Sequence, residues 1–163
     1  MKLSFPVEEA INVQMKNEFF SAQLYRNMQI WSASRGYVGM EKFFAKRVAE
    51  ETAHGDKWMK LLLENDNNAY MAEIEAPKRE WDSAFEMFQY ASSHEKFVTA
   101  EIHKIYGMVF EDKNHQALKT LQWFANEQVE EENMFETLLL RLGYASDSAA
   151  AVLEMDREIG NHA

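Results

Sequence analysis

The chain contains no cysteine, and this absence excludes several kinds of chemistry together. Without thiols there can be no disulfide, thiolate zinc site, iron–sulfur cluster or thiol nucleophile. The chain also lacks any run of about 20 apolar residues, which a membrane-spanning helix needs. Its start, MKLSFPVEEA, reaches Glu8 and Glu9 too early to hold the apolar region of a signal peptide. We therefore expect a soluble, cytoplasmic protein.

Positive charge is scarce: 17 Lys and Arg face 27 Asp and Glu, which gives a formal net charge of -10. Nucleic acids and anionic membranes reward clustered Lys and Arg, so neither is expected as a partner. The negative charge is compatible with attracting cations. With 163 residues, 47% of them hydrophobic, the chain is long enough for one domain with one proper core, spanning residues 1–163.

Glycine and proline are also few, at six and two, and this favours long helices over many short strands. Apolar residues recur with a period of 3.6 in four long segments, which we predict as helices over about 7–34, 40–65, 82–110 and 114–143. Gly143 is expected to end the fourth helix. A short fifth helix is expected over about 149–159, after the sequence SDS.

The connections between these segments predict how the helices are arranged. The first and third connections are short, so each joins an antiparallel helix pair. The middle connection, about 67–81, is longer. A helix of about 28 residues is about 42 Å long, and about fifteen extended residues reach about 50 Å. We therefore predict an all-α fold, a four-helix bundle over about 7–143 with one long crossover loop, which is the ferritin-like arrangement.

Each predicted helix carries an apolar stripe that is interrupted near its middle. The interrupting residues are Glu18, Glu51, His54, Glu95, Gln128 and Glu131. In an antiparallel bundle the helix midpoints share one level, so these side chains should meet in the core. Singly, each has a plainer interpretation, such as a carboxylate turned to solvent or a hydrogen-bonded core histidine. No Lys or Arg is expected at the same level on these stripes.

Four carboxylates in an apolar interior need an explanation. An unpaired buried ion costs several kcal/mol, against a total stability of about 5–15 kcal/mol for a domain. The acids must therefore keep protons or hold metal, and oxygens with one imidazole suit iron or manganese better than structural zinc. Glu51 and His54 form one Glu-x-x-His of the di-iron bundle pattern, whereas the fourth helix offers Gln128-x-x-Glu131.

Several stretches extend this likeness beyond the acidic residues. They are NEFFSAQLY, AEETAHGDKW, EIEAPKREW, SHEKFVTAEIHKI and LQWFANEQVEEENMFETLL. Through them the chain resembles bacterial non-haem ferritins over nearly its whole length. The resemblance implies a hollow homo-oligomeric cage of twenty-four subunits that takes up Fe²⁺. It implies ferroxidase activity with O₂ or peroxide at an intrasubunit di-iron centre, and storage of ferric mineral inside.

The resemblance also implies roles for individual residues. The first iron site consists of Glu18, Glu51 and His54, and the second of Glu51, Glu95 and Glu131, with Glu51 bridging. The second site has no imidazole, so it should bind iron more weakly, and iron is better treated as a substrate than as a fixed cofactor.

Other residues are implied beside the di-iron centre. Gln128 and Tyr25 lie close to it, and Glu50, Glu127 and Glu130 match an extra iron site of the bacterial members. A solvated acidic patch is the alternative for these last three.

Two departures from related families limit what the resemblance implies. A bacterioferritin needs a second Glu-x-x-His and usually carries a haem-ligating Met directly after the bridging Glu. This chain has Thr52 at that position, directly after Glu51, so no haem is expected. Leu118 and Leu121 replace the acidic pore residues of animal ferritins, which argues against iron uptake through an acidic three-fold channel. A bacterioferritin-like protein, or another di-iron carboxylate oxidase or peroxidase of smaller oligomeric state, is the alternative. A purely structural bundle leaves the core acids unexplained.

Some features of the sequence have no assigned function. Gly55 and Gly107 fall inside predicted helices, at about 1 kcal/mol each relative to Ala, either for packing or for local bending. A second apolar stripe on the first helix is expected to make subunit contacts, with packing under the crossover loop as the alternative. It consists of Phe20, Leu24 and Trp31. The remaining histidines, expected at the surface or at helix ends, are His94, His103 and His115.

Overall fold

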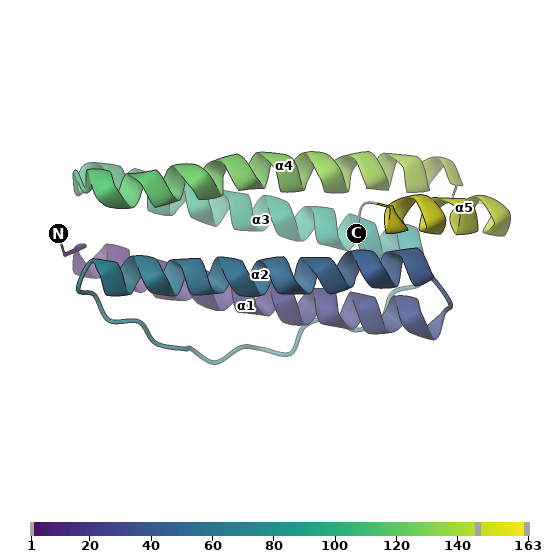
Figure 1. Ribbon diagram of the computed structural model, residues 1–163, viewed down its shortest axis with the longest axis horizontal. Coiled ribbons are helices and arrows are strands. Elements are labelled where there is room, and N and C mark those ends of the chain that lie inside the picture. The colour runs from purple at the N-terminus through teal and green to yellow at the C-terminus, as the bar shows by residue number, and fades with distance from the viewer. Residues whose placement is uncertain (1, 146–147, 162–163) are drawn as a thin grey trace.

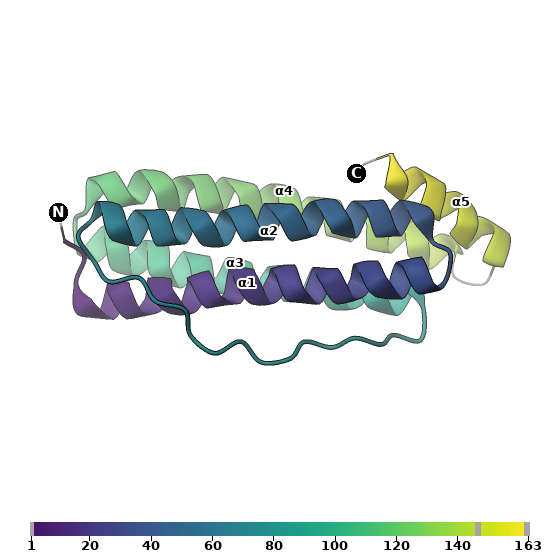
Figure 2. The same cartoon turned by 60° about the horizontal axis from the view of Figure 1, so that its bottom comes forward.

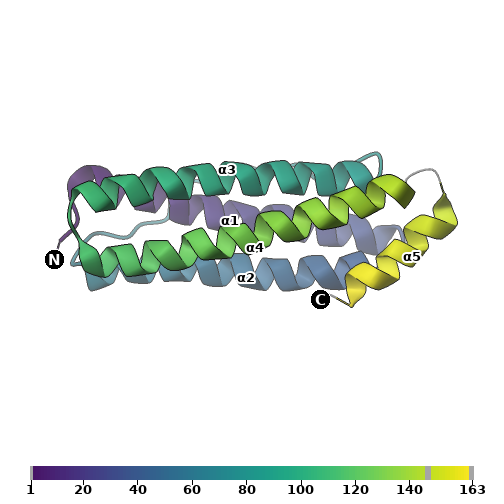
Figure 3. The same cartoon turned by 90° about the horizontal axis from the view of Figure 1, so that it is seen from above.

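The computed structural model describes residues 2–145 and 148–161, and in these residues the regular structure is entirely helical (Figure 1). The helices are α1 Phe5–Ser34, α2 Val38–Glu64, α3 Ala84–Glu111, α4 His115–Ala145 and α5 Ala149–Gly160. The antiparallel pairs α1/α2 and α3/α4 form a four-helix bundle, and α5 packs on α2 and α4 at one end (Figure 3). The predicted all-α four-helix bundle with one long crossover and a short fifth helix is confirmed. No helix of the described chain combines the length and apolarity that crossing a membrane requires.

The helix boundaries match the sequence prediction closely, with one clear error at Gly143. We expected this glycine to end the fourth helix, but α4 continues to Ala145. Gly143 does not have the positive φ that a terminating glycine uses, whereas Gly36, between α1 and α2, has φ of 76°. The turn between the first two helices therefore depends on glycine, and the end of α4 does not.

The short helix α5 is joined to the start of α2 by a side-chain cap. The carboxylate of Asp156 accepts hydrogen bonds from the backbone amides of Gly39, at 3.1 Å, and Met40, at 2.8 Å. Tyr37, the residue before α2, offers no capping side chain of its own. A Cβ on Gly39 would lie 1.7 Å from the backbone oxygen of Asp156, so the close approach of α5 requires glycine there.

The crossover between α2 and α3 runs along the length of the bundle beside α1 (Figure 2). Hydrogen bonds along its length fix it to that helix, and three of them mark its course. The amide of Tyr70 donates to Asn12 Oδ1 at 2.9 Å, Asn27 Nδ2 donates to the Lys78 carbonyl at 3.2 Å, and Trp31 Nε1 donates to the Trp81 carbonyl at 3.1 Å. The loop therefore covers the outer side of α1, as its predicted reach requires.

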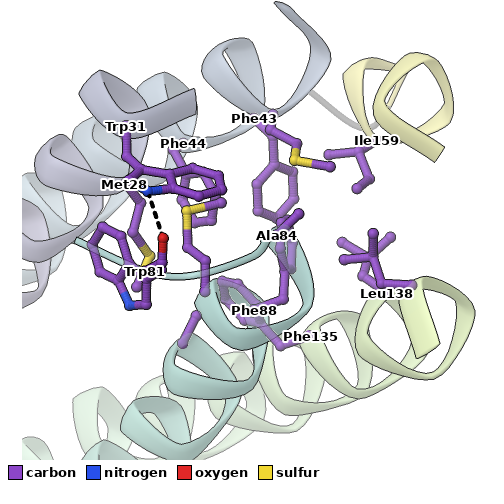
Figure 4. Close-up of a cluster of buried hydrophobic side chains, with 14 of the residues drawn as sticks. Met28, Trp31, Phe43, Phe44, Trp81, Ala84, Phe88, Phe135, Leu138 and Ile159 are labelled. Atoms are coloured by element: carbon purple, nitrogen blue, oxygen red, sulfur yellow. Dashed lines mark hydrogen bonds between the residues drawn. The ribbon is translucent and has the colours of Figure 1, made fainter. Parts of the chain in front are cut away.

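This covering corrects the prediction for the second apolar stripe of α1. Leu24 and Trp31 are buried within the chain, and Phe20 packs partly buried against the same cluster. Trp31 meets the ring of Trp81 edge-on, with 6.2 Å between centroids, and hydrogen bonds to its backbone (Figure 4). The expectation of subunit contacts for Leu24 and Trp31 was wrong, because both are already buried within the chain and the crossover supplies a partner for Trp31.

The core divides into two apolar clusters, one toward each end of the bundle. The cluster near α5 includes Phe43, Phe88 and Phe135 (Figure 4), and the other includes Trp58 and Phe124. The apolar residues predicted to face inward are all buried except Val48, which is half-buried. They are Val7, Ile11, Met15, Ala22, Tyr25 and Met28 on α1; Phe44, Val48, Trp58 and Leu61 on α2; Phe88, Ala91, Val98, Ile102 and Ile105 on α3; and Leu121, Phe124, Phe135, Leu138 and Leu142 on α4. The polar interruptions fall between the two clusters, at the middle of every long helix.

Candidate metal centre

The middle level of the bundle holds the six polar side chains that interrupt the stripes, and the structure buries all of them. They are Glu18 on α1, Glu51 and His54 on α2, Glu95 on α3, and Gln128 and Glu131 on α4. Residues three apart lie on one helix face, so each pair on α2 and α4 points the same way. Side chains from four helices therefore place carboxylate, amide and imidazole groups in one buried layer of the bundle.

Glu18, Glu51 and His54 form the tightest group in this layer. One potential ligand atom from each lies within 4.8 Å of the other two, and no other three His, Asp or Glu residues of the described chain do so. His54 Nδ1 is 3.5 Å from Glu51 Oε2. This spacing leaves room for one cation between an imidazole nitrogen and two carboxylate oxygens.

Neighbouring side chains hold this triad in place. Glu18 Oε1 accepts hydrogen bonds from Trp58 Nε1 at 2.7 Å and from Gln14 Nε2 at 2.9 Å. The His54 ring meets the edge of Trp123, with centroids 5.6 Å apart, and Phe124 stacks on Trp58 at 4.0 Å. Hydrogen-bond donors orient Glu18 and aromatic rings pack around His54, as the surroundings of protein metal sites commonly do.

Glu95 faces the triad from α3 and is held by two other helices. The hydroxyl of Tyr25 donates to its Oε1, and Gln128 Nε2 donates to its Oε2 at 3.1 Å. Gln128 also donates to the hydroxyl of Thr99 at 3.1 Å. The two residues predicted beside the centre, Tyr25 and Gln128, are thus the hydrogen-bond partners of one candidate ligand.

Glu131 has a partner that the sequence analysis missed. Arg47 on α2 is 6% exposed, and its Nη1 lies 2.9 Å and 3.1 Å from the two carboxylate oxygens of Glu131. The expectation that no Lys or Arg lies at this level was therefore wrong. The signal was available, because Arg47 precedes Glu51 by four residues and so shares its helix face.

Burial and mutual repulsion change the acidity of these carboxyl groups. Burial, followed by the charges of Glu95 and Glu18, raises the pKa of Glu51 well above its usual range. Burial and the charge of Glu131 raise the pKa of Glu95 to about 8. Burial raises the pKa of Glu131 to about 7, although Arg47 opposes the change. Without metal, the cluster therefore retains protons at neutral pH instead of carrying its full negative charge.

The three acids predicted as an extra iron site lie at the outer edge of this layer. Glu50 and Glu127 are half-buried and Glu130 is exposed. Arg47 forms an ion pair with Glu50, and the charges of Glu50 and Glu127 help to raise the pKa of Glu131. Glu50 and Glu127 therefore lie close enough to Glu131 to act on its charge, and Arg47 contacts both Glu50 and Glu131.

The expectation for one of the remaining histidines was wrong. His103 and His115 are exposed, but His94 is half-buried, its Nε2 is 2.7 Å from Ser21 Oγ, and burial lowers its pKa to about 4. It therefore contributes a neutral ring to the packing beside the centre.

Packing explains one of the two helical glycines. At Gly55 a Cβ would meet the Phe19 ring at 2.7 Å, whereas at Gly107 it would meet nothing within 4 Å. Gly55 is therefore required by packing, and nothing in the structure explains Gly107.

The residues present fit a transition-metal cation. A donor set of carboxylates with a single imidazole and no thiolate suits iron or manganese, and the acids become deprotonated when a cation takes the place of their protons.

Comparisons with known proteins agree with this interpretation. The sequence profile described as "Ferritin-like domain" matches residues 8–143. The chain is 35% identical over 159 residues to a probable bacterial non-heme ferritin-like protein of Haemophilus influenzae, covering 98% of this chain and 96% of the relative. It is 33% identical over 158 residues to the bacterial non-heme ferritin of Staphylococcus aureus, covering 97% and 95%. The open pore ferritin of the archaeon Archaeoglobus fulgidus superposes with a TM-score of 0.94 at 30% identity, covering 98% of each chain.

Proposed function

The chain belongs to the ferritin family of iron storage proteins, and from this membership and its buried acidic layer we propose that it oxidises Fe²⁺ at an intrasubunit centre and stores the ferric product. The observation that carries the proposal is the buried triad of Glu18, Glu51 and His54, whose potential ligand atoms lie within 4.8 Å of one another. Iron is the substrate and cargo of this centre, not a resident cofactor.

The triad is the proposed first iron site, and Glu51, Glu95 and Glu131 are the proposed second. Glu51 contributes to both, which would keep two Fe²⁺ ions close enough to give one electron each to the same O₂. With two protons the product is hydrogen peroxide, and two Fe³⁺ ions remain. A peroxide oxidant would accept the same two electrons and give water.

The protein's own groups would prepare this reaction by handling protons and charge. The raised pKa values of Glu51 and Glu95 place protons where the cations bind. Each arriving Fe²⁺ would displace protons, so the net charge of the layer would change by less than the two positive charges of the ion. Tyr25 and Gln128 keep Glu95 oriented toward the layer. Glu50, Glu127 and Glu130 are the proposed outer iron site, leading from solvent toward Glu131.

The proposal extends to a cage of twenty-four copies of this chain in the cytoplasm, with no nucleic acid or membrane as partner. Haem is not part of it. Thr52, at the position where a bacterioferritin usually carries its haem-ligating Met, is exposed, and its hydroxyl bonds to the Val48 carbonyl at 2.7 Å. An uptake route other than an acidic three-fold channel is also proposed, since Leu121 is buried in the core and Leu118 packs against it.

Aerobic Fe²⁺ oxidation in Glu51→Ala and His54→Ala tests the proposed centre. We expect the initial rate to fall by at least about 100-fold, because even partners outside the ligand shell change metal affinity or activity by about 10–100-fold. Glu64→Ala and His103→Ala remove exposed side chains of the same types and serve as matched controls. Unchanged rates in both triad variants would rule out the assignment. Sedimentation of the native protein separates a cage from the smaller oligomer of a di-iron oxidase.

A further inference from the structure

Arg47 is a buried cation in contact with two acids at different depths. Its Nη1 bonds both oxygens of Glu131, at 2.9 Å and 3.1 Å, while its Nη2 pairs with Glu50. The side chain of Glu131 is 5% exposed and that of Glu50 is 32% exposed. The guanidinium therefore connects Glu131 in the buried layer to Glu50 at the outer edge of that layer.

This contact concerns the proposed second iron site and not the first. Among the described residues, the ion pairs of Arg47 are with Glu50 and Glu131, whereas Glu18 is held by Trp58 and Gln14. Both oxygens of Glu131 accept hydrogen bonds from Arg47, so a cation that binds Glu131 competes with the guanidinium for the same carboxylate. A second positive ion would also meet the charge of the guanidinium at close range.

We propose that Arg47 is a displaceable counter-cation that holds Glu131 away from coordination, keeps the second iron site weak and leaves the first site unaffected. This inference rests on the proposed function, because it assigns a role within the same centre. Arg47 is a positioning residue in this proposal: it acts on the cation through Glu131 and does not touch it.

The pair with Glu50 makes the displacement feasible. A guanidinium left without a partner in the core would cost several kcal/mol. If Glu131 turns toward a cation, Arg47 still has Glu50, which lies nearer to solvent. When the ion leaves, the guanidinium can return to both oxygens of Glu131, so the arrangement favours release of the second ion over its permanent retention.

Binding of Co²⁺, a divalent cation that O₂ does not readily oxidise at such a site, tests the inference by calorimetry. In the native protein we expect a strong and a weak class of site. Arg47→Gln should tighten the weak class by at least about tenfold, because it removes both the competitor for Glu131 and a like charge beside the ion, and should leave the strong class within about twofold. Arg47→Lys keeps the charge and should keep the weak class weak. Arg141→Gln, which removes an exposed pair with Glu158, is the matched control.

The outcomes separate this inference from the proposed function. If the Co²⁺ affinity of the weak class is unchanged or lower in Arg47→Gln while that of the strong class is unchanged, only the role of Arg47 is overturned. A native protein that binds no Co²⁺ overturns the proposed function and this inference with it. If Arg47→Gln does not fold, crystals of the native protein soaked in Co²⁺ decide the matter. We expect Arg47 to contact Glu50 only; a guanidinium still bonded to both oxygens of Glu131 beside two bound ions refutes the proposal.

Discussion

The hydroxyl of Tyr25 on α1 donates a hydrogen bond to Glu95 Oε1 on α3, and both side chains are fully enclosed in the bundle. Burial, together with the charge of Glu95, raises the pKa of Tyr25 well above its ordinary value. The phenol therefore remains a donor at any physiological pH. Because Glu95 has a second oxygen, bonded to Gln128, this donor can persist while the carboxylate binds a cation.

Tyr25→Phe is accordingly expected to weaken the second metal site. Its hydrogen bond favours the ionised form of Glu95, and bonds to charged groups contribute about 1.5–3 kcal/mol. We predict that Co²⁺ affinity at the weaker class of site falls about tenfold or more at pH 7, and that the difference narrows at pH 9. Tyr106→Phe, which loses only a hydrogen bond to Gln122 near the surface, is the control. Equal affinities in Tyr25→Phe and the native protein would contradict the prediction.

The stability of the metal-free protein should fall as pH rises from 6.5 to 8. Unfolded carboxyl groups lose their protons near pH 4.5, whereas burial holds the folded pKa at about 8 for Glu95 and about 7 for Glu131. The folded state thus binds more protons in this range, and the free energy of unfolding decreases with pH. His94, with a folded pKa of about 4 against a usual 6.5, acts in the opposite direction only below pH 6.5.

The predicted fall in stability can be checked by measuring the melting temperature of the protein between pH 6.5 and 8 in the presence of a chelator. Glu95→Gln should reduce the fall of the melting temperature with rising pH, because it removes a titrating carboxyl group from the layer. Saturating Co²⁺ should do the same, because the cation displaces the titrating proton. A melting temperature that rises between pH 6.5 and 8 in the metal-free native protein would show that the carboxyl groups are already ionised.

The two helical glycines form a matched pair for a packing experiment. Gly107→Ala should raise the free energy of unfolding by about 1 kcal/mol, since alanine favours the helix and a Cβ meets nothing within 4 Å. At Gly55 the same change places the Cβ 2.7 Å from the Phe19 ring, and such overpacking costs about 1–3 kcal/mol. Urea denaturation should therefore give a higher free energy of unfolding for Gly107→Ala than for the native protein, and a lower one for Gly55→Ala. The reverse order would exclude close packing as the reason for Gly55.

Removing the cap that α5 provides should destabilise the start of α2. Asp156→Ala leaves the amides of Gly39 and Met40 without their acceptor, and the loss of such a cap costs about 1–2 kcal/mol. Asp156→Asn keeps an acceptor oxygen and should recover most of that stability. Urea denaturation of both variants measures the difference, and equal losses in the two would indicate that charge, not capping, is what α5 contributes.

The sequence predicts the helices and most of the centre because both follow the period of 3.6. Glu18, Glu51 and Glu95 lie on faces that are otherwise apolar, and their burial follows from that pattern. Arg47 lies four residues before Glu51 on the same helix face, but it is a charged residue outside the apolar stripe, so the pattern does not predict its burial.

Other features depend on contacts that no periodic pattern contains. Trp31 is buried because a loop lies over it, and the path of a loop is fixed by individual hydrogen bonds. Asp156 caps the first turn of α2 at Gly39, which lies 117 residues earlier in the chain, and only the docking of α5 reveals this contact. Glycine is the usual residue type at a helix end, but α4 continues past Gly143 to Ala145.

The crossover separates the proposed ligands of the centre into two groups along the chain, and cutting the loop would show this. Glu18, Glu51 and His54 all precede it, whereas Glu95, Gln128 and Glu131 all follow it. A protease nick in the loop would leave two helical hairpins, with every ligand of the first site on one fragment. The second site would exist only while the fragments stay associated, so metal binding there would report their complementation.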